Sequence, residues 1–97
     1  MSQLMLKSPS KKAIEPLVIS ALDAKQNEIL TAIIKTEQKL SIFEKKFNLS
    51  TSDFLIGNQQ EIPQISEMDA IEWSGEHETL KILQEKLSRL QEIQVCT

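Results

Sequence analysis

The sequence predicts an all-α protein, and three observations lead to that class. The 97 residues include only 2 Gly, 3 Pro and no Tyr, too few turn-forming and aromatic residues for a β-sandwich or barrel. Twelve Ile and twelve Leu stand among many Lys, Glu and Gln, a composition typical of helices. Apolar residues recur at helical spacing over two long stretches. We therefore expect a long antiparallel helical hairpin, with a short helix in the connection and a short N-terminal strand or tail.

The chain begins with an alternating run, QLMLK at residues 3–7, in which Leu4 and Leu6 would share one face of a strand. Such a short strand is not stable unless it pairs with another segment. Pro16 then leaves two alternatives for the first long helix. It begins near Pro16 after a short turn, or it begins near Ser10 and bends at the proline.

Residues 16–46 contain no Gly and, after Pro16, no further Pro, and they are expected to form the first long helix. Asn48 suits a left-handed position after the last turn, with Leu49 folding back onto the helix. The apolar residues of this segment recur at the spacing of one helical stripe. They are Leu22, Ile29, Ile33, Leu40, Phe43 and Phe47.

Two capping sequences divide the rest of the chain. Residues 50–53 and 66–69 each match the capping box, with Asp in the place of Glu. The first is expected to open a short helix that ends at Gly57, and the second a helix over residues 67–94. Gly75, inside this second long helix, predicts a close contact with another helix. The apolar stripe there consists of Ala70, Trp73, His77, Leu80, Leu83, Leu87 and Leu90.

The expected domains are an N-terminal strand or tail at 1–15, a helical hairpin at 16–94 and a C-terminal tail at 95–97. The two long helices would measure about 46 and 42 Å. A compact globule of this chain length is only about 32 Å across. A hairpin also leaves apolar residues outside the two stripes exposed. We therefore expect two copies to dimerise into a four-helix arrangement.

Charge is unevenly distributed along the chain. Residues 53–78 hold seven acidic residues and no Lys or Arg, whereas the net charge of the whole chain is −3. One interpretation is a solvated loop and helix start, where acids oppose the positive end of the helix dipole. The other is a surface that attracts a basic protein partner. A pI near 5.1 is unfavourable for nonspecific nucleic-acid binding.

The sequence carries no catalytic signature, so we expect a protein that is not an enzyme and has no cofactor. It has no glycine-rich phosphate loop, and a single histidine, His77, which lies on the apolar stripe. Glu72 and Glu76 lie one turn apart and would hold a cation only weakly, so no metal site is expected. The only cysteine, Cys96, lacks an activating neighbour. One cysteine, no signal-peptide pattern and no membrane-length apolar run favour a cytoplasmic location.

Two segments resemble a known group of proteins. They are FNLSTSDF at residues 47–54 and DAIEWSGEHE at residues 69–78. These segments are similar to those of small helical proteins of cyanobacteria and archaea, which share a D-x-x-E-W-x-G-x-x-E helix start and are regarded as antitoxins of toxin–antitoxin pairs. The resemblance covers residues 35–94. It implies a non-catalytic partner that binds and neutralises a basic, ribonuclease-like toxin.

Three functional hypotheses follow. In the first, the chain binds a basic protein partner through Asp69, Glu72, Trp73 and Glu76, with Trp73 either a core residue or a partner anchor. In the second, it is a DNA-binding autoregulator like the ribbon-helix-helix repressors, whose paired strands would present Gln3, Met5 and Lys7 to the major groove. That fold needs a turn between two helices, and Asn27 is the only candidate for it. In the third, the chain is a structural helical adaptor. None involves a membrane or a small-molecule substrate.

Overall fold

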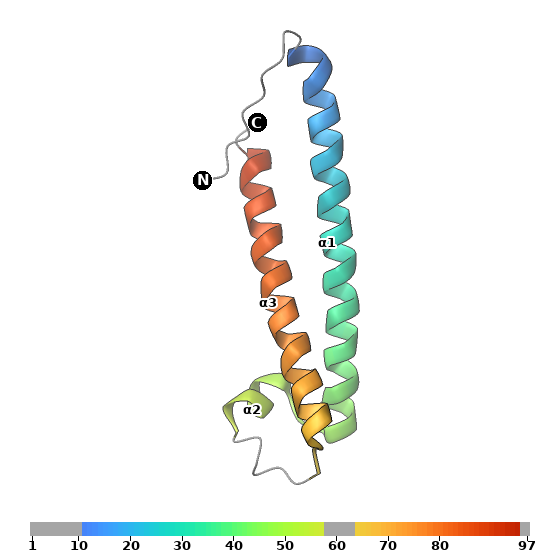
Figure 1. Ribbon diagram of the computed structural model, residues 1–97, viewed down its shortest axis with the longest axis vertical. Helices are drawn as coiled ribbons and strands as arrows, with labels where there is room; N and C mark the ends of the chain where they lie inside the picture. The colour runs from blue at the N-terminus through green and yellow to red at the C-terminus, as the bar shows by residue number, and fades with distance from the viewer. Residues whose placement is uncertain (1–10, 58–63, 96–97) are drawn as a thin grey trace.

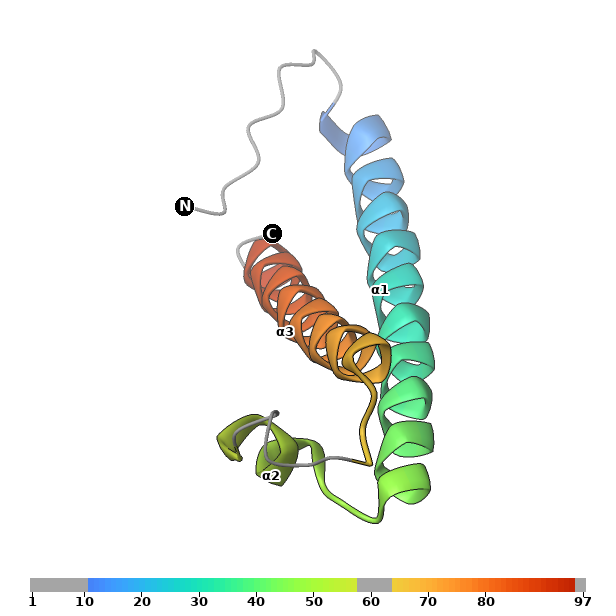
Figure 2. The ribbon, with the colours of Figure 1, turned by 60° about the horizontal axis from the view of Figure 1, so that its bottom comes forward.

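The computed structural model describes residues 11–57 and 64–95, which form three helices (Figure 1). The helices are α1 (Lys11–Phe47), α2 (Thr51–Ile56) and α3 (Glu67–Val95). Helices α1 and α3 lie side by side and antiparallel, and α2 lies beside the end of the hairpin where α1 leads into α3 (Figures 1 and 2). The described ranges contain no strand. The predicted all-α hairpin with a short connecting helix is confirmed, whereas the strand expected at residues 3–7 lies outside the described residues.

Helix α1 is continuous from its first turn to its last. It begins at Lys11 and contains Pro16, so the helix start near Ser10 is the alternative that the structure adopts. The domain boundary expected between residues 15 and 16 therefore falls inside α1. At the other end of the chain, Val95 belongs to α3 rather than to a separate tail.

The C-terminal end of α1 is closed by a left-handed residue, as the sequence predicts. Asn48 has φ 50°, and the Leu49 backbone N–H donates to the Glu44 carbonyl oxygen at 3.1 Å. This bond satisfies a carbonyl of the last turn that would otherwise lack a partner. Leu49 then packs against the hydrophobic core and turns the chain toward α2.

Both predicted capping residues are in place. The Ser50 side-chain oxygen accepts from the Asp53 backbone N–H at 3.1 Å, and the Ser66 oxygen accepts from the Asp69 N–H at 3.1 Å. Each serine satisfies one of the free N–H groups of a first helical turn. Helix α2 stops after Ile56, where the Gly57 N–H donates to the Asp53 carbonyl at 2.9 Å.

The hydrophobic core is concentrated at the α2 end of the hairpin. Its buried residues come from all three helices and from the segment just before α3, and a ring of half-buried residues packs against them. The buried residues are Leu40, Phe54, Ile65, Ala70 and Trp73; the half-buried ones are Phe43, Phe47, Leu49 and Leu80.

Burial decreases away from this end. On α1, Ile29 and Ile33 remain buried, but on α3 no residue from Ser74 to Ile93 is buried, although the leucine stripe continues. Gln26 lies in this half with its side-chain oxygen covered and, among the described residues, without a hydrogen-bond donor. The molecule measures 63 × 22 × 19 Å, and its radius of gyration of 19.1 Å exceeds the value of about 12.5 Å expected for a compact chain of this length.

Candidate functional site

Trp73 is the centre of the buried end of the hairpin. Its side chain is 0% exposed and is contacted by three phenylalanine rings in stacked orientation. The ring centroids lie at 4.1 Å for Phe54 on α2, and at 5.5 and 5.8 Å for Phe43 and Phe47 on α1. The tryptophan of α3 therefore holds both other helices through aromatic contacts.

A chain of hydrogen bonds joins the same three helices. The Trp73 indole N–H donates to Thr51 Oγ1 at 2.9 Å, and the Thr51 hydroxyl donates to Glu44 Oε2 at 2.8 Å. The Thr51 backbone N–H donates to the same carboxylate oxygen at 2.9 Å. Thr51 is buried, so this network satisfies the indole N–H, the hydroxyl and one free N–H of the first turn of α2.

The four residues that the sequence proposes as partner contacts differ in exposure and in the contacts they make. Trp73 is fully buried, which is the core alternative, and its indole has no accessible surface for a partner. Asp69 and Glu76 form ion pairs with α1, to Lys46 at 3.4 Å and to Lys39 at 3.7 Å. Glu72 is exposed and lies on the same side of α3. The acidic start of α3 is thus partly neutralised by lysines of the same chain.

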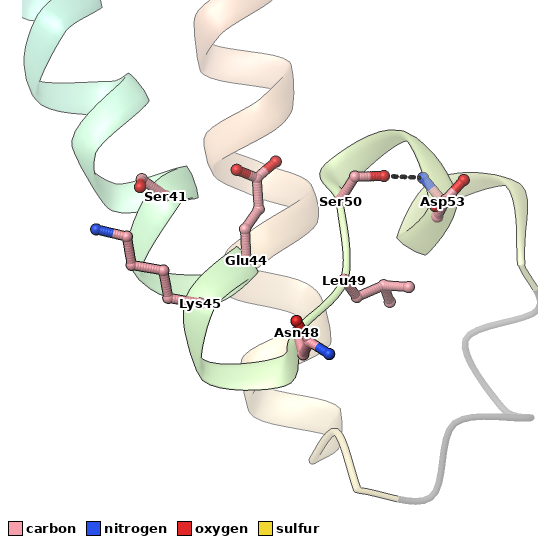
Figure 3. Close-up of a pocket in the computed structure, with 7 residues that line it drawn as sticks. All are labelled: Ser41, Glu44, Lys45, Asn48, Leu49, Ser50 and Asp53. Atoms are coloured by element: carbon pink, nitrogen blue, oxygen red, sulfur yellow. Dashed lines mark hydrogen bonds between the residues drawn. The ribbon is translucent and has the colours of Figure 1, made fainter.

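Two surface hollows flank the buried end. One is lined by Lys39, Ile42, Phe43, Glu72 and Glu76, and it leaves the Phe43 ring half-buried. The other lies between the end of α1 and α2, where the Ser50 side-chain oxygen accepts from the Asp53 backbone N–H (Figure 3). It is lined by Ser41, Glu44, Lys45, Asn48, Leu49, Ser50 and Asp53.

Neither hollow contains a histidine or a cysteine that could act with the carboxylates. Among residues 11–57 and 64–95, no three His, Cys, Asp or Glu side chains lie close enough together to bind a metal ion. His77 is half-buried on the inner stripe of α3, as its position in the sequence indicates.

A different surface, the outer face of α3, carries exposed apolar side chains. We use this name for Met68, Ile71, Gly75 and Ile82, which follow one another at steps of three, four and seven residues. The three apolar side chains are 76%, 64% and 49% exposed. A Cβ atom added at Gly75 would meet nothing within 4 Å, so the close contact predicted for this glycine is wrong within the chain. The spacing of the four residues was visible in the sequence but was hidden by the stronger inner stripe.

The DNA-binding alternative receives no support from the part of the chain that the structure describes. Gln3, Met5 and Lys7 lie outside the described residues. Helix α1 runs without interruption through Asn27, so the turn that a ribbon-helix-helix fold requires there is absent. The reason is local, because the residues around Asn27 are strong helix formers and one asparagine does not break such a segment.

Comparisons of the chain with protein-family models, with curated proteins and with solved structures find no match. The similarity to antitoxins therefore stays a prediction. No helix within the described ranges combines the length and apolar character needed to cross a membrane.

Proposed function

We propose that the chain is a non-catalytic protein-interaction module that binds a basic protein partner through the outer face of α3. The observation that carries this proposal is Gly75. A glycine inside a helix destabilises it by about 0.5–1 kcal/mol relative to alanine, and the hairpin itself has no steric need for it. A partner that approaches the α3 backbone closely at this point would give the glycine a role.

The neighbours of Gly75 suit such a partner. Met68 and Ile71 lie about two turns and one turn before the glycine, and their exposed side chains provide apolar area beside it. Apolar side chains at the centre of an interface supply most of its affinity.

The charge of the surrounding surface indicates a basic partner. The exposed carboxylates of Glu67 and Glu72 flank the apolar residues, and residues 53–78 contain no Lys or Arg to repel a cation. An acidic rim of this kind accelerates association with a basic surface and discriminates against acidic ones. A ribonuclease-like toxin, whose active site must hold RNA phosphates, has such a basic surface. This is the partner that the antitoxin resemblance implies.

The test is binding of the protein encoded by the adjacent gene, purified separately and titrated by calorimetry. We expect Gly75→Leu to weaken binding by at least about 2 kcal/mol, or about thirtyfold, because the side chain obstructs the contact. Ile34→Leu on α1, also an exposed position, is the matched control and should leave the affinity unchanged. Unchanged binding by a folded Gly75→Leu variant would remove the outer face from the interface.

The role of charge is tested separately by the double variant Glu67→Lys, Glu72→Lys. Reversal of both carboxylates should slow association with a basic partner and reduce the dependence of the association rate on salt. Stopped-flow measurements over a series of ionic strengths give both quantities. An unchanged rate, or no binding of the neighbouring protein by the wild-type chain, contradicts the proposed acidic recognition.

The four-helix dimer expected from the sequence belongs to the same proposal. A module built from one hairpin leaves apolar residues outside its two inner stripes exposed, and on α1 both Leu17 and Ile42 are more than 60% exposed. Association of two hairpins would cover part of this surface.

A further inference from the structure

We infer that one arginine side chain of the partner enters the hollow between α1 and α3. This hollow, which we call the Phe43 hollow, is lined by Lys39, Ile42, Phe43, Glu72 and Glu76. Its carboxylates would hold the guanidinium group, and its apolar residues would contact the stem of the side chain. The inference rests on the proposed function, because it assigns one contact of the basic partner, and it adds residues of α1 to the interface.

The lining of the Phe43 hollow comes from two helices, so its shape depends on the packing of the hairpin. Ile42 and Phe43 belong to α1, and two glutamates one turn apart on α3 complete the lining with Lys39. Trp73 stacks on the Phe43 ring, with 5.5 Å between the centroids and 10° between the planes, and holds it in place. The Phe43 ring is only half-buried, and Ile42 is 64% exposed. The hairpin thus provides a preformed apolar surface that a partner can contact.

The size and position of the Phe43 hollow suit a side chain of a protein bound to the outer face of α3. Its volume is about 240 Å³, below the range of about 300–1,000 Å³ typical of small-molecule sites. Glu72 lies four residues after Met68 and three before Gly75, so it is a neighbour of both on the helix surface. The hollow therefore borders the outer face, and a partner seated there reaches it.

The charge of the Phe43 hollow favours a cation. It contains two carboxylates and one lysine, a net charge of −1. The Lys39 ammonium group lies 3.7 Å from Glu76 Oε2 and partly neutralises that carboxylate. Within residues 11–57 and 64–95, no lysine or arginine forms an ion pair with Glu72. The Glu72 carboxylate is therefore available to a cation supplied by the partner.

Arginine matches this lining better than lysine does. A guanidinium group is planar, so it stacks on an aromatic ring and donates two parallel hydrogen bonds to one carboxylate. Its methylene stem also covers apolar surface while the charged end stays at the rim. A lysine ammonium group is compact and more strongly hydrated, so it gains less beside Ile42 and Phe43. An aromatic ring beside a free carboxylate therefore selects arginine.

The second hollow, between the end of α1 and α2, lacks this combination. Its lining includes the carboxylates of Glu44 and Asp53 together with Lys45, but no aromatic side chain. Glu44 Oε2 already accepts two hydrogen bonds from Thr51. The inference therefore concerns the Phe43 hollow alone.

The first experiment uses a capped glycine–arginine–glycine peptide, titrated into the full chain at low ionic strength and followed by NMR. We expect weak, saturable shifts of the Ile42 methyl and Phe43 ring signals. Peptides with citrulline, lysine or leucine in place of arginine should each bind at least about fivefold more weakly. Absence of these shifts with the arginine peptide would overturn the inference, and so would equal binding of any of the other three peptides.

Two variants should change the affinity for the arginine peptide in opposite directions. Glu72→Gln removes the free carboxylate and should weaken binding about fivefold, whereas Lys39→Met frees Glu76 and should strengthen it about threefold. Glu85→Gln and Lys45→Met are the matched controls, because they make the same changes of charge at exposed positions outside the Phe43 hollow. Equal effects of the variants and their controls would reduce the interaction to general electrostatic attraction and overturn the inference.

The same variants test the contact with the protein encoded by the adjacent gene. Its affinity should fall with Glu72→Gln and rise with Lys39→Met. If that protein binds and neither variant changes its affinity, the arginine contact is wrong, while the outer-face interface still stands or falls with Gly75→Leu. If the wild-type chain does not bind that protein, the proposed function fails, and the peptide titration alone decides whether the Phe43 hollow selects arginine.

Discussion

At the scale of single residues, Thr51 connects the parts of the core. It belongs to the first turn of α2, yet it accepts from the Trp73 indole N–H and donates to the Glu44 carboxylate. Buried polar groups are costly when they lose a partner, so the three side chains depend on one another. The tryptophan is therefore fixed by hydrogen bonding as well as by ring stacking, which fits a structural role for this side chain.

We expect Thr51→Val to destabilise the fold by about 1–3 kcal/mol, because it leaves the buried indole N–H without its acceptor and removes one of the two hydrogen bonds that Glu44 Oε2 accepts from Thr51. Thr51→Ser keeps the hydroxyl and should cost less. Trp73→Ala removes the ring that contacts all three phenylalanines and should cost about 3–5 kcal/mol. Urea denaturation at one fixed protein concentration compares the four proteins. A Thr51→Val variant as stable as the wild type would show that the network contributes little.

The sequence predicts the position of Trp73 but not its partners. Its place on the helical stripe indicates burial, and Phe43 and Phe47 lie on the predicted stripe of the first long helix, whereas no stripe was predicted for the short helix that carries Phe54. Thr51 is 22 residues away and appears in the sequence only as part of a capping pattern. Contacts across such a separation depend on how α2 docks, which no local pattern determines. The pairing of Asp69 and Glu76 with lysines of α1 was missed for the same reason.

At the scale of elements, the ends of the helices follow from local chemistry. Ser50, Ser66 and Asn48 each act on N–H or carbonyl groups within a few residues, so their sequence patterns are sufficient to predict them. The start of α1 was not determined in this way. Pro16 is acceptable in the first turn of a helix and disfavoured farther in, and the structure places it inside α1.

Gly75 provides a test at this scale. Because a Cβ atom there meets nothing, Gly75→Ala should stabilise α3 by about 0.5–1 kcal/mol through the lower entropy of the unfolded chain. Thermal unfolding should show a rise in the melting temperature of about 4–8 °C for each kcal/mol. Ser74→Ala, the preceding helical position, serves as a comparison. A lower melting temperature for Gly75→Ala would mean that the glycine already makes a close contact, for instance with a second copy.

At the scale of the whole molecule, the length of the helices and the distribution of buried residues both indicate that one hairpin does not form a compact globule. The sequence predicts helices longer than a compact monomer, and the structure has an extent of 63 Å with its buried residues gathered toward one end. Periodicity alone predicts which residues face inward, but it does not predict how completely two helices cover them. Leu83 and Leu90 illustrate this, since both lie on the predicted stripe and both are only half-buried.

This uneven burial predicts a gradient of local stability along the hairpin. Amide hydrogen exchange is fastest where few buried apolar contacts hold a helix in place. In dilute protein, amides around Leu40 and Trp73 should exchange only through global unfolding. Those before Ile29 on α1 and after Leu83 on α3 should exchange much sooner. Association of two hairpins into the proposed four-helix dimer should slow exchange in this second group as concentration rises, while exchange in the first group continues to follow global stability. Mass spectrometry of peptides at low and high concentration measures both effects. Uniform protection along both helices in the monomer would contradict the gradient, because it would mean that two helices alone suffice to hold the far half together.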